Sequence, residues 1–166
     1  MVRSQTAGFT MVEILIVVVI LGILAMVVIP RYGTATTEAR EAALTGDLQS
    51  LQRQIDRYKV EHTGRGPELG SSGVVDSANF ALRLTKQTDI AGTLDVKGRY
   101  GPYVPEMPDN PFVADFKLAR LVKVGKGVAP RDETTGWFFD TVSQKISPNS
   151  KTGALADFPA KPAGRR

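Results

Sequence analysis

The hydrophobic positions of this chain are concentrated near its amino-terminal end. Residues 14–29 contain no polar side chain. When the run is extended back to residue 9, Thr10 and Glu13 are its only polar residues. A helix of these 21 residues would be about 31 Å long, which matches the hydrocarbon core of a bilayer. The pattern predicts a transmembrane helix over residues 9–29. A buried core helix is disfavoured, because the rest of the chain has too little apolar surface to enclose it.

A secretory signal peptide is an alternative interpretation of this segment. Arg3 would be its basic region, but the apolar run is long for a signal peptide and no small-residue cleavage site follows it. Because basic residues favour the cytoplasmic side, Arg3 indicates that the amino terminus is cytoplasmic and that the remainder lies outside the cytoplasm.

Glu13 is the charged side chain inside the apolar run. A carboxylate in a transmembrane segment costs about 2.5–3.5 kcal/mol on insertion scales, so Glu13 is a candidate functional residue. The run contains no Lys or Arg, so a compensating cation must come from another chain, from lipid or water, or from an amino terminus created by cleavage. The simpler alternative is that Glu13 lies one turn inside the bilayer and reaches toward water.

A second helical pattern follows over residues 35–61, which are charged and favour a helix. Its apolar stripe has spacings of 4, 3, 4 and 3, at Leu44, Leu48, Leu51, Ile55 and Tyr58. This spacing predicts an amphipathic helix packed on its own sheet rather than a coiled coil, with Thr63 and Gly64 as its stop.

The remaining residues predict loops, a short helix and a small sheet. Asp76 or Ser77 can cap a short helix that continues to Thr88. Residues 100–112 carry a proline at every third position from 102 to 111, which favours a polyproline II loop. Three short segments, at residues 117–124, 137–140 and 144–147, read as antiparallel strands, and the end of the chain reads as a disordered tail.

Composition excludes several classes of function. The chain has no cysteine and a single histidine, His62, which we place on the surface near the end of the amphipathic helix. Its 21 basic and 17 acidic residues are mixed along the sequence and form no stripe, so the net charge of +4 does not indicate nucleic-acid binding. No acid, base and nucleophile converge, and we expect no enzyme activity.

The residues GFTMVEILIVVVILGILAMVVIP resemble the amino-terminal signal of type IV pilins and type II secretion pseudopilins. The resemblance combines a short basic leader, an aromatic residue after Gly8, an acid at Glu13 and an apolar run. It implies that a prepilin peptidase cuts between Gly8 and Phe9 and that the new amine of Phe9 is N-methylated.

The resemblance also implies roles in a filament. Glu13 would face the amino terminus of a neighbouring subunit and set the register of assembly. The helix would lose hydrogen bonds locally between Gly22 and Pro30, for which a plain kink at the membrane surface is the alternative.

The fold implied by the resemblance is α+β and pilin-like, with a long amino-terminal helix packed on a small carboxyl-terminal antiparallel sheet. We expect a leader peptide at residues 1–8, a transmembrane helix at 9–29, an amphipathic continuation at 30–63, a loop-rich periplasmic region with three strands at 64–148 and a disordered tail at 149–166.

The function implied is that of a structural subunit of a type II secretion pseudopilus, most like the major pseudopilin. Its expected partners are prepilin peptidase, the inner membrane, other pilin-like subunits and the secretion or pilus assembly machinery. A type IV pilus subunit for adhesion, motility or DNA uptake is the alternative within the family, and the absence of cysteine disfavours it because adhesive pilins often carry a disulfide. An unprocessed single-pass membrane protein with an external binding domain is an alternative of another class.

The resemblance raises the question of a calcium site, because major pseudopilins often bind calcium in a carboxyl-terminal loop. Asp132, Glu133 and Asp140 do not reproduce that loop. We therefore expect no metal and no cofactor.

Overall fold

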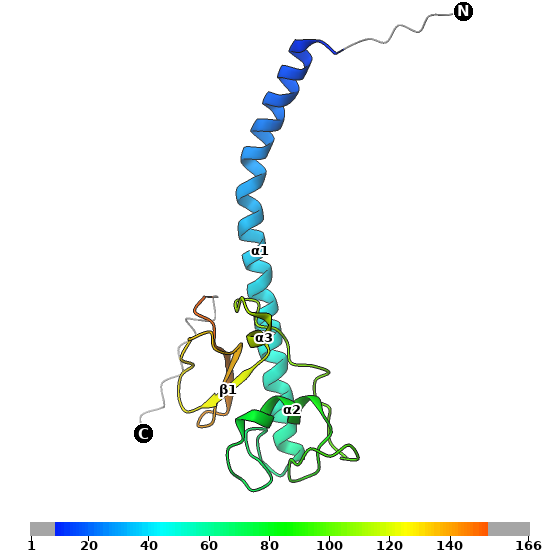
Figure 1. Ribbon diagram of the computed structural model, residues 1–166, viewed down its shortest axis with the longest axis vertical. Coiled ribbons are helices and arrows are strands. Elements are labelled where there is room, and N and C mark those ends of the chain that lie inside the picture. Colours follow the sequence, from blue (N-terminus) through cyan, green and yellow to red (C-terminus); the bar gives the residue numbers. More distant parts are fainter. Residues whose placement is uncertain (1–8, 153–166) are drawn as a thin grey trace, which may run out of the picture. The chain divides into compact units, whose positions relative to one another are not determined.

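The computed structural model describes residues 9–152, apart from the side chains of residues 27–35. The chain divides into two compact units, Met1–Ala39 and Arg40–Arg166, and the backbone of helix α1 belongs to both. The elements are α1 (Met11–Glu61), η1 (Ser77–Asn79), α2 (Phe80–Thr85), α3 (Phe116–Ala119), β1 (Val122–Gly125), β2 (Trp137–Asp140) and β3 (Lys145–Pro148) (Figure 1). The α+β class is therefore confirmed.

The second unit is built on the apolar stripe of α1. Leu44, Leu51, Ile55 and Tyr58 are each at most 1% exposed, and Leu48 packs against the same core. The predicted packing of the stripe is confirmed, and Figure 1 shows the sheet and α2 around this part of the helix. The helix ends at Glu61, and Gly64, with φ at +84°, donates its amide to the carbonyl of Lys59.

The aromatic residues of β2 and α2 complete this core. Trp137, Phe139 and Phe80 are fully buried, and the rings of Phe80 and Phe139 lie 5.0 Å apart between centroids. The indole Nε1 of Trp137 donates to the carbonyl of Pro108 at 2.9 Å, which fastens the proline-rich segment to the sheet. Because a buried indole N–H needs an acceptor, this bond fixes where that loop crosses the unit.

The short helix begins where the sequence predicted, at the Asp76 cap. The amide of Asn79 donates to Oδ1 of Asp76 at 3.4 Å, and Phe80 and Leu84 are fully buried. The helix ends at Thr85 rather than at Thr88, because the backbone of Lys86 is extended.

The sheet has the order β1-β2-β3 and is mixed. Strands β2 and β3 are antiparallel across a tight turn, as predicted, but β1 and β2 are parallel, with Val122 opposite Trp137. The prediction of a fully antiparallel sheet was therefore wrong at β1. The connection over residues 126–136 returns the chain to the starting end of β1, and parallel pairing requires such a long return. The predicted first strand also starts as helix α3, because Asp115 accepts the amide of Lys117 at 2.8 Å as a cap.

His62 is fully buried, so its predicted surface position was wrong. Its ring stacks on Tyr58 with centroids 3.8 Å apart. Nδ1 lies 2.9 Å from the carbonyl oxygen of Tyr58, and Nε2 lies 3.0 Å from Oγ1 of Thr88. Because a carbonyl only accepts, Nδ1 donates to the carbonyl of Tyr58, and Nε2 pairs with the hydroxyl of Thr88. His62 continues the stripe of Ile55 and Tyr58 by one further turn.

The predicted tail starts too early. Asn149 and Ser150 are at most 2% exposed, and the side chain of Asn149 accepts the amide of Arg131 at 2.8 Å. These two residues belong to the folded unit rather than to a disordered tail. The rest of the predicted tail, at residues 153–166, lies outside the described residues.

We predict that Leu51→Ala lowers the free energy of unfolding of the second unit by about 2–5 kcal/mol, because it leaves a cavity in the core. Val60→Ala, on a side chain that is 82% exposed in the same helix, is the matched control and should change it by less than about 0.5 kcal/mol. The fluorescence of Trp137, the single tryptophan, reports unfolding in a urea titration of the full chain in detergent micelles. Equal midpoints for the two variants would show that the stripe does not hold the unit together.

Candidate functional site

The start of α1 is organised by Thr10 and Glu13. Because the helix begins at Met11, Thr10 is its N-cap residue and Glu13 is the third residue of its first turn. The amide and the hydroxyl of Thr10 both donate to Oε2 of Glu13, at 3.1 and 3.0 Å, and the amide of Glu13 donates to Oγ1 of Thr10 at 3.3 Å. This reciprocal arrangement is a capping box, which satisfies amides that the first turn of a helix leaves unpaired.

The capping box gives Thr10 a role that the sequence patterns above did not assign. The signal that predicts it is a threonine three residues before a glutamate at the start of an apolar run. It also shows that Glu13 stabilises its own helix in two ways, since a carboxylate in the first turn opposes the positive end of the helix dipole.

One carboxylate oxygen of Glu13, Oε1, accepts no hydrogen bond from the residues that the structure describes. All of its hydrogen bonds within residues 9–152 reach Oε2, and the side chain is exposed. Oε1 can therefore accept a further donor, such as an amine, without loss of the cap.

Apolar side chains surround Glu13 on every face of the helix. Phe9 and Met11 are 80% and 93% exposed, and even Val17, the least exposed of the bulky apolar residues up to Met26, is 49% exposed. A contiguous apolar surface of this kind marks a site of association with lipid or protein. Within residues 9–26 and 36–152, no helix has an apolar stretch long enough to cross a membrane.

The other predicted site residues lie at different distances from Glu13. Phe9 directly precedes the capping box, whereas Gly8 lies outside the described residues. Gly22 lies in α1 about 14 Å along the helix from Glu13, and a Cβ added to it would meet no atom within 4 Å apart from its chain neighbours and the adjacent helix backbone. The backbone of Pro30 also belongs to α1. The structure thus groups Phe9, Thr10 and Glu13 and leaves Gly22 and Pro30 apart from them.

Comparison with known proteins extends these observations. Residues 3–29 match the family model described as the prokaryotic N-terminal methylation motif. The chain is 31% identical over 115 residues to type II secretion system core protein G of Vibrio cholerae, covering 69% of this chain and 70% of that protein. The chain belongs to the family of type II secretion system core protein G.

Two further relatives carry the same name. Core protein G of Aeromonas hydrophila is 27% identical over 76% of this chain and 81% of the relative. Core protein G of Pseudomonas aeruginosa is 40% identical over 37% of this chain and 44% of the relative. No solved structure matches this chain. The methylation motif and the family together make the protein a pseudopilin subunit of type II secretion.

In this pseudopilin, the cap at Thr10 should be separable from the charge of Glu13. We predict that Thr10→Val speeds the hydrogen exchange of the Glu13 amide about fivefold, because an N-cap contributes about 1 kcal/mol. Thr10→Ser keeps the acceptor oxygen and should exchange like the unchanged chain. Residue-resolved exchange by NMR in micelles checks this, and equal rates in the two variants would contradict the capping box.

Proposed function

We propose that prepilin peptidase removes residues 1–8 of this pseudopilin by cutting between Gly8 and Phe9, and that the new amine of Phe9 is then methylated. The match of residues 3–29 to the methylation motif supports this processing. The exposure of Phe9 supports it too, because the residue that would follow the cut is accessible just before the first turn of α1.

The processed protein is an inner-membrane subunit with a single span at residues 9–29. Its amino terminus faces the cytoplasm, and the unit from Arg40 onward is periplasmic. The observation that carries this proposal is that the apolar side chains of residues 9–26 are exposed on all faces of the helix, so the helix needs a non-aqueous environment. The single Arg3 of the leader supports the orientation.

The role of the protein is structural. Subunits polymerise through residues 9–29, with other pilin-like subunits, into a pseudopilus. The secretion machinery is the partner of this filament, which supports protein export. The same apolar surface that contacts lipid in the membrane contacts neighbouring helices in the filament, and its burial supplies most of the cohesion.

Glu13 sets the axial register of this assembly. Its free Oε1 accepts the methylated ammonium of Phe9 from a neighbouring subunit, while Oε2 keeps the bond to Thr10. In an apolar filament core the ion pair holds only when both charges are at the same level, because an unpaired buried charge is strongly unfavourable. The burial cost of Glu13 therefore selects one register.

Gly22 and Pro30 make the helix between them the easiest part of α1 to unwind during assembly. Glycine costs about 1 kcal/mol relative to alanine in a helix interior, and proline lacks an amide donor. Local loss of hydrogen bonds between these residues would let neighbouring helices adjust their packing.

The processing step can be tested by co-expression with a prepilin peptidase and intact-mass spectrometry. We expect a chain that starts at Phe9 and carries one added methyl group. Gly8→Leu should block cleavage and serves as the control, together with an inactive peptidase. An intact chain starting at Met1, or one cut beyond residue 29, would contradict the proposal and would indicate an unprocessed membrane protein or a signal peptide.

The register role predicts that charge at Glu13, and not only its cap, is needed for filaments. Glu13→Ala should insert into the membrane normally but yield no detectable filaments, since the unpaired ammonium costs about 3–5 kcal/mol per contact. Glu13→Gln can still close the capping box and separates the two roles. We expect Glu13→Gln to fail as Glu13→Ala does, in electron microscopy of sheared filaments, with alkaline extraction to verify insertion. Normal filaments from Glu13→Gln would show that the charge has no register role.

A further inference from the structure

The connection between β1 and β2, at residues 126–136, is fastened at Asp132. Nζ of Lys123, on β1, donates to Oδ2 of Asp132 at 2.6 Å. Thr134 donates its hydroxyl to Oδ1 at 2.7 Å, and Nδ2 of Asn149 donates to the same oxygen at 2.7 Å. These donors, with the Lys123 ammonium foremost, hold the pKa of Asp132 well below its usual range.

Asn149 joins the same cluster to the chain after β3. It is fully buried, its Oδ1 accepts the amide of Arg131 at 2.8 Å, and its carbonyl accepts the amide of Glu133 at 3.1 Å. Arg131 and Glu133 have φ values of 54° and 58°, which residues other than glycine adopt at a cost. The connection therefore needs these contacts to keep its shape.

The other two acids of this region also have partners. Oδ1 of Asp140 accepts the amide of Gly127 at 2.7 Å, and its Oδ2 accepts the amide of Ser143 at 3.0 Å. Burial raises the pKa of Asp140, but the hydrogen bonds from Ser143, Val142 and Gly127 outweigh it and lower that pKa to about 2. The carboxylate of Glu133 lies 3.5 Å from Nζ of Lys151.

This set of side chains does not fit calcium, the ion that the family resemblance implies. Calcium takes about six to eight oxygen ligands at roughly 2.3–2.6 Å. Here two of the three acids face an ammonium group, and each of the three already accepts hydrogen bonds from the protein. Among the residues that the structure describes, no group of three or more His, Asp or Glu side chains could hold a metal.

We propose that the ammonium group of Lys123 closes the β1–β2 connection by binding Asp132, and that this pseudopilin folds and stays folded without calcium. The ammonium group of Lys123, a side chain of β1, takes the place of a bound cation in this cluster. It supplies one positive charge, whereas a calcium ion would supply two. The inference rests on the family membership and on the described contacts, and is independent of the proposed processing and register.

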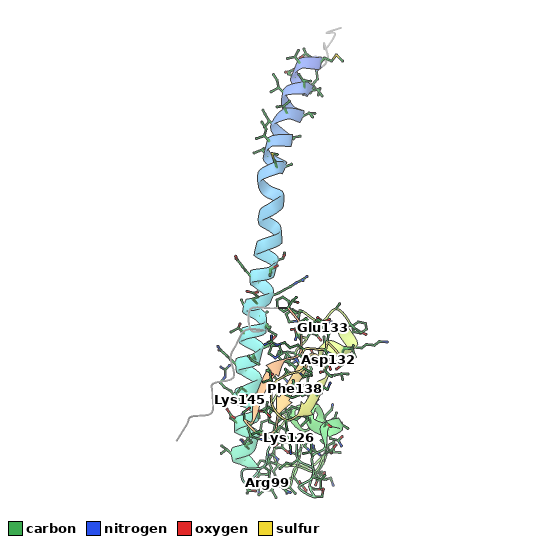
Figure 2. The ribbon with its side chains drawn as sticks, turned by 90° about the vertical axis from the view of Figure 1, so that its left-hand side faces the viewer. Arg99, Lys126, Asp132, Glu133, Phe138 and Lys145 are labelled. Atoms are coloured by element: carbon green, nitrogen blue, oxygen red, sulfur yellow. The ribbon has the colours of Figure 1, made fainter. Side chains whose placement is uncertain are left out.

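Lys126 provides a matched control in the same connection. Its side chain makes no ion pair among residues 9–152, and Figure 2 shows it apart from the adjacent Asp132 and Glu133. Lys126→Met thus removes the same charge as Lys123→Met without removing the contact to Asp132.

The test is thermal unfolding of the full chain in detergent micelles, followed by the fluorescence of Trp137, which is fully buried in β2. We expect the same Tm, within about 1 °C, in excess EGTA and in millimolar calcium chloride. Lys123→Met should lower the Tm by about 3–6 °C in both solutions. Lys126→Met should leave it unchanged, and Lys123→Arg, which keeps a cationic donor, should recover most of the loss.

A double-mutant cycle with Asp132→Asn sharpens the test. If Lys123 acts through Asp132, adding Lys123→Met to Asp132→Asn should lower the Tm little further. A Tm that rises with calcium, or saturable calcium binding to the unchanged chain by calorimetry, would overturn the proposal. Equal effects of Lys123→Met and Lys126→Met would overturn it as well. None of these outcomes bears on cleavage at Gly8 or on filament formation, so the two proposals fail independently.

Discussion

The main physical constraint on this protein is that the apolar side chains on the first part of α1 must be removed from water. From residue 9 to residue 26 they surround the helix, and nothing in the described subunit covers them. Removing such surface from water is favourable by about 25 cal/mol of free energy per square ångström, so the helix associates with lipid or with other helices. In the function that we propose, membrane anchoring and filament assembly are two successive uses of one surface. In the same proposal, the capped carboxylate of Glu13 distinguishes one axial position of the helix from another.

The carboxyl-terminal part of α1 has apolar residues on one face only. This face packs with Trp137, Phe139 and Phe80 in the hydrophobic core of the second unit. One helix therefore carries two surfaces in sequence, which lets a folded unit be attached to an assembly segment without a separate linker. The loops of that unit are held by polar side chains. His62 and Asn149 are fully buried and bond Thr88 and Arg131, and the partly exposed Lys123 bonds Asp132.

Sequence patterns predicted the features that depend on residues close together in the chain. The stripe of α1 and the cap at Asp76 depend on residues within one or two turns, and both were confirmed. The parallel pairing of β1 was missed because strands of four residues show the same alternation in either direction, and the course of residues 126–136 decides between them. His62 and Asn149 were misplaced because their partners are distant in sequence. The Thr10 cap was predictable from its spacing, whereas coordinates were needed to show that only one oxygen of Glu13 accepts hydrogen bonds from residues 9–152.

A structure of the assembled filament by electron cryomicroscopy would show what surrounds the first part of α1 and what surrounds the unit from Arg40 onward. We predict that residues 9–26 form the filament interior and that the unit from Arg40 onward faces solvent. We also expect Oε1 of Glu13 within about 4 Å of the Phe9 amine of a neighbouring subunit. A filament in which residues 9–26 face solvent, or in which Glu13 contacts only its own Thr10, would contradict the proposed assembly.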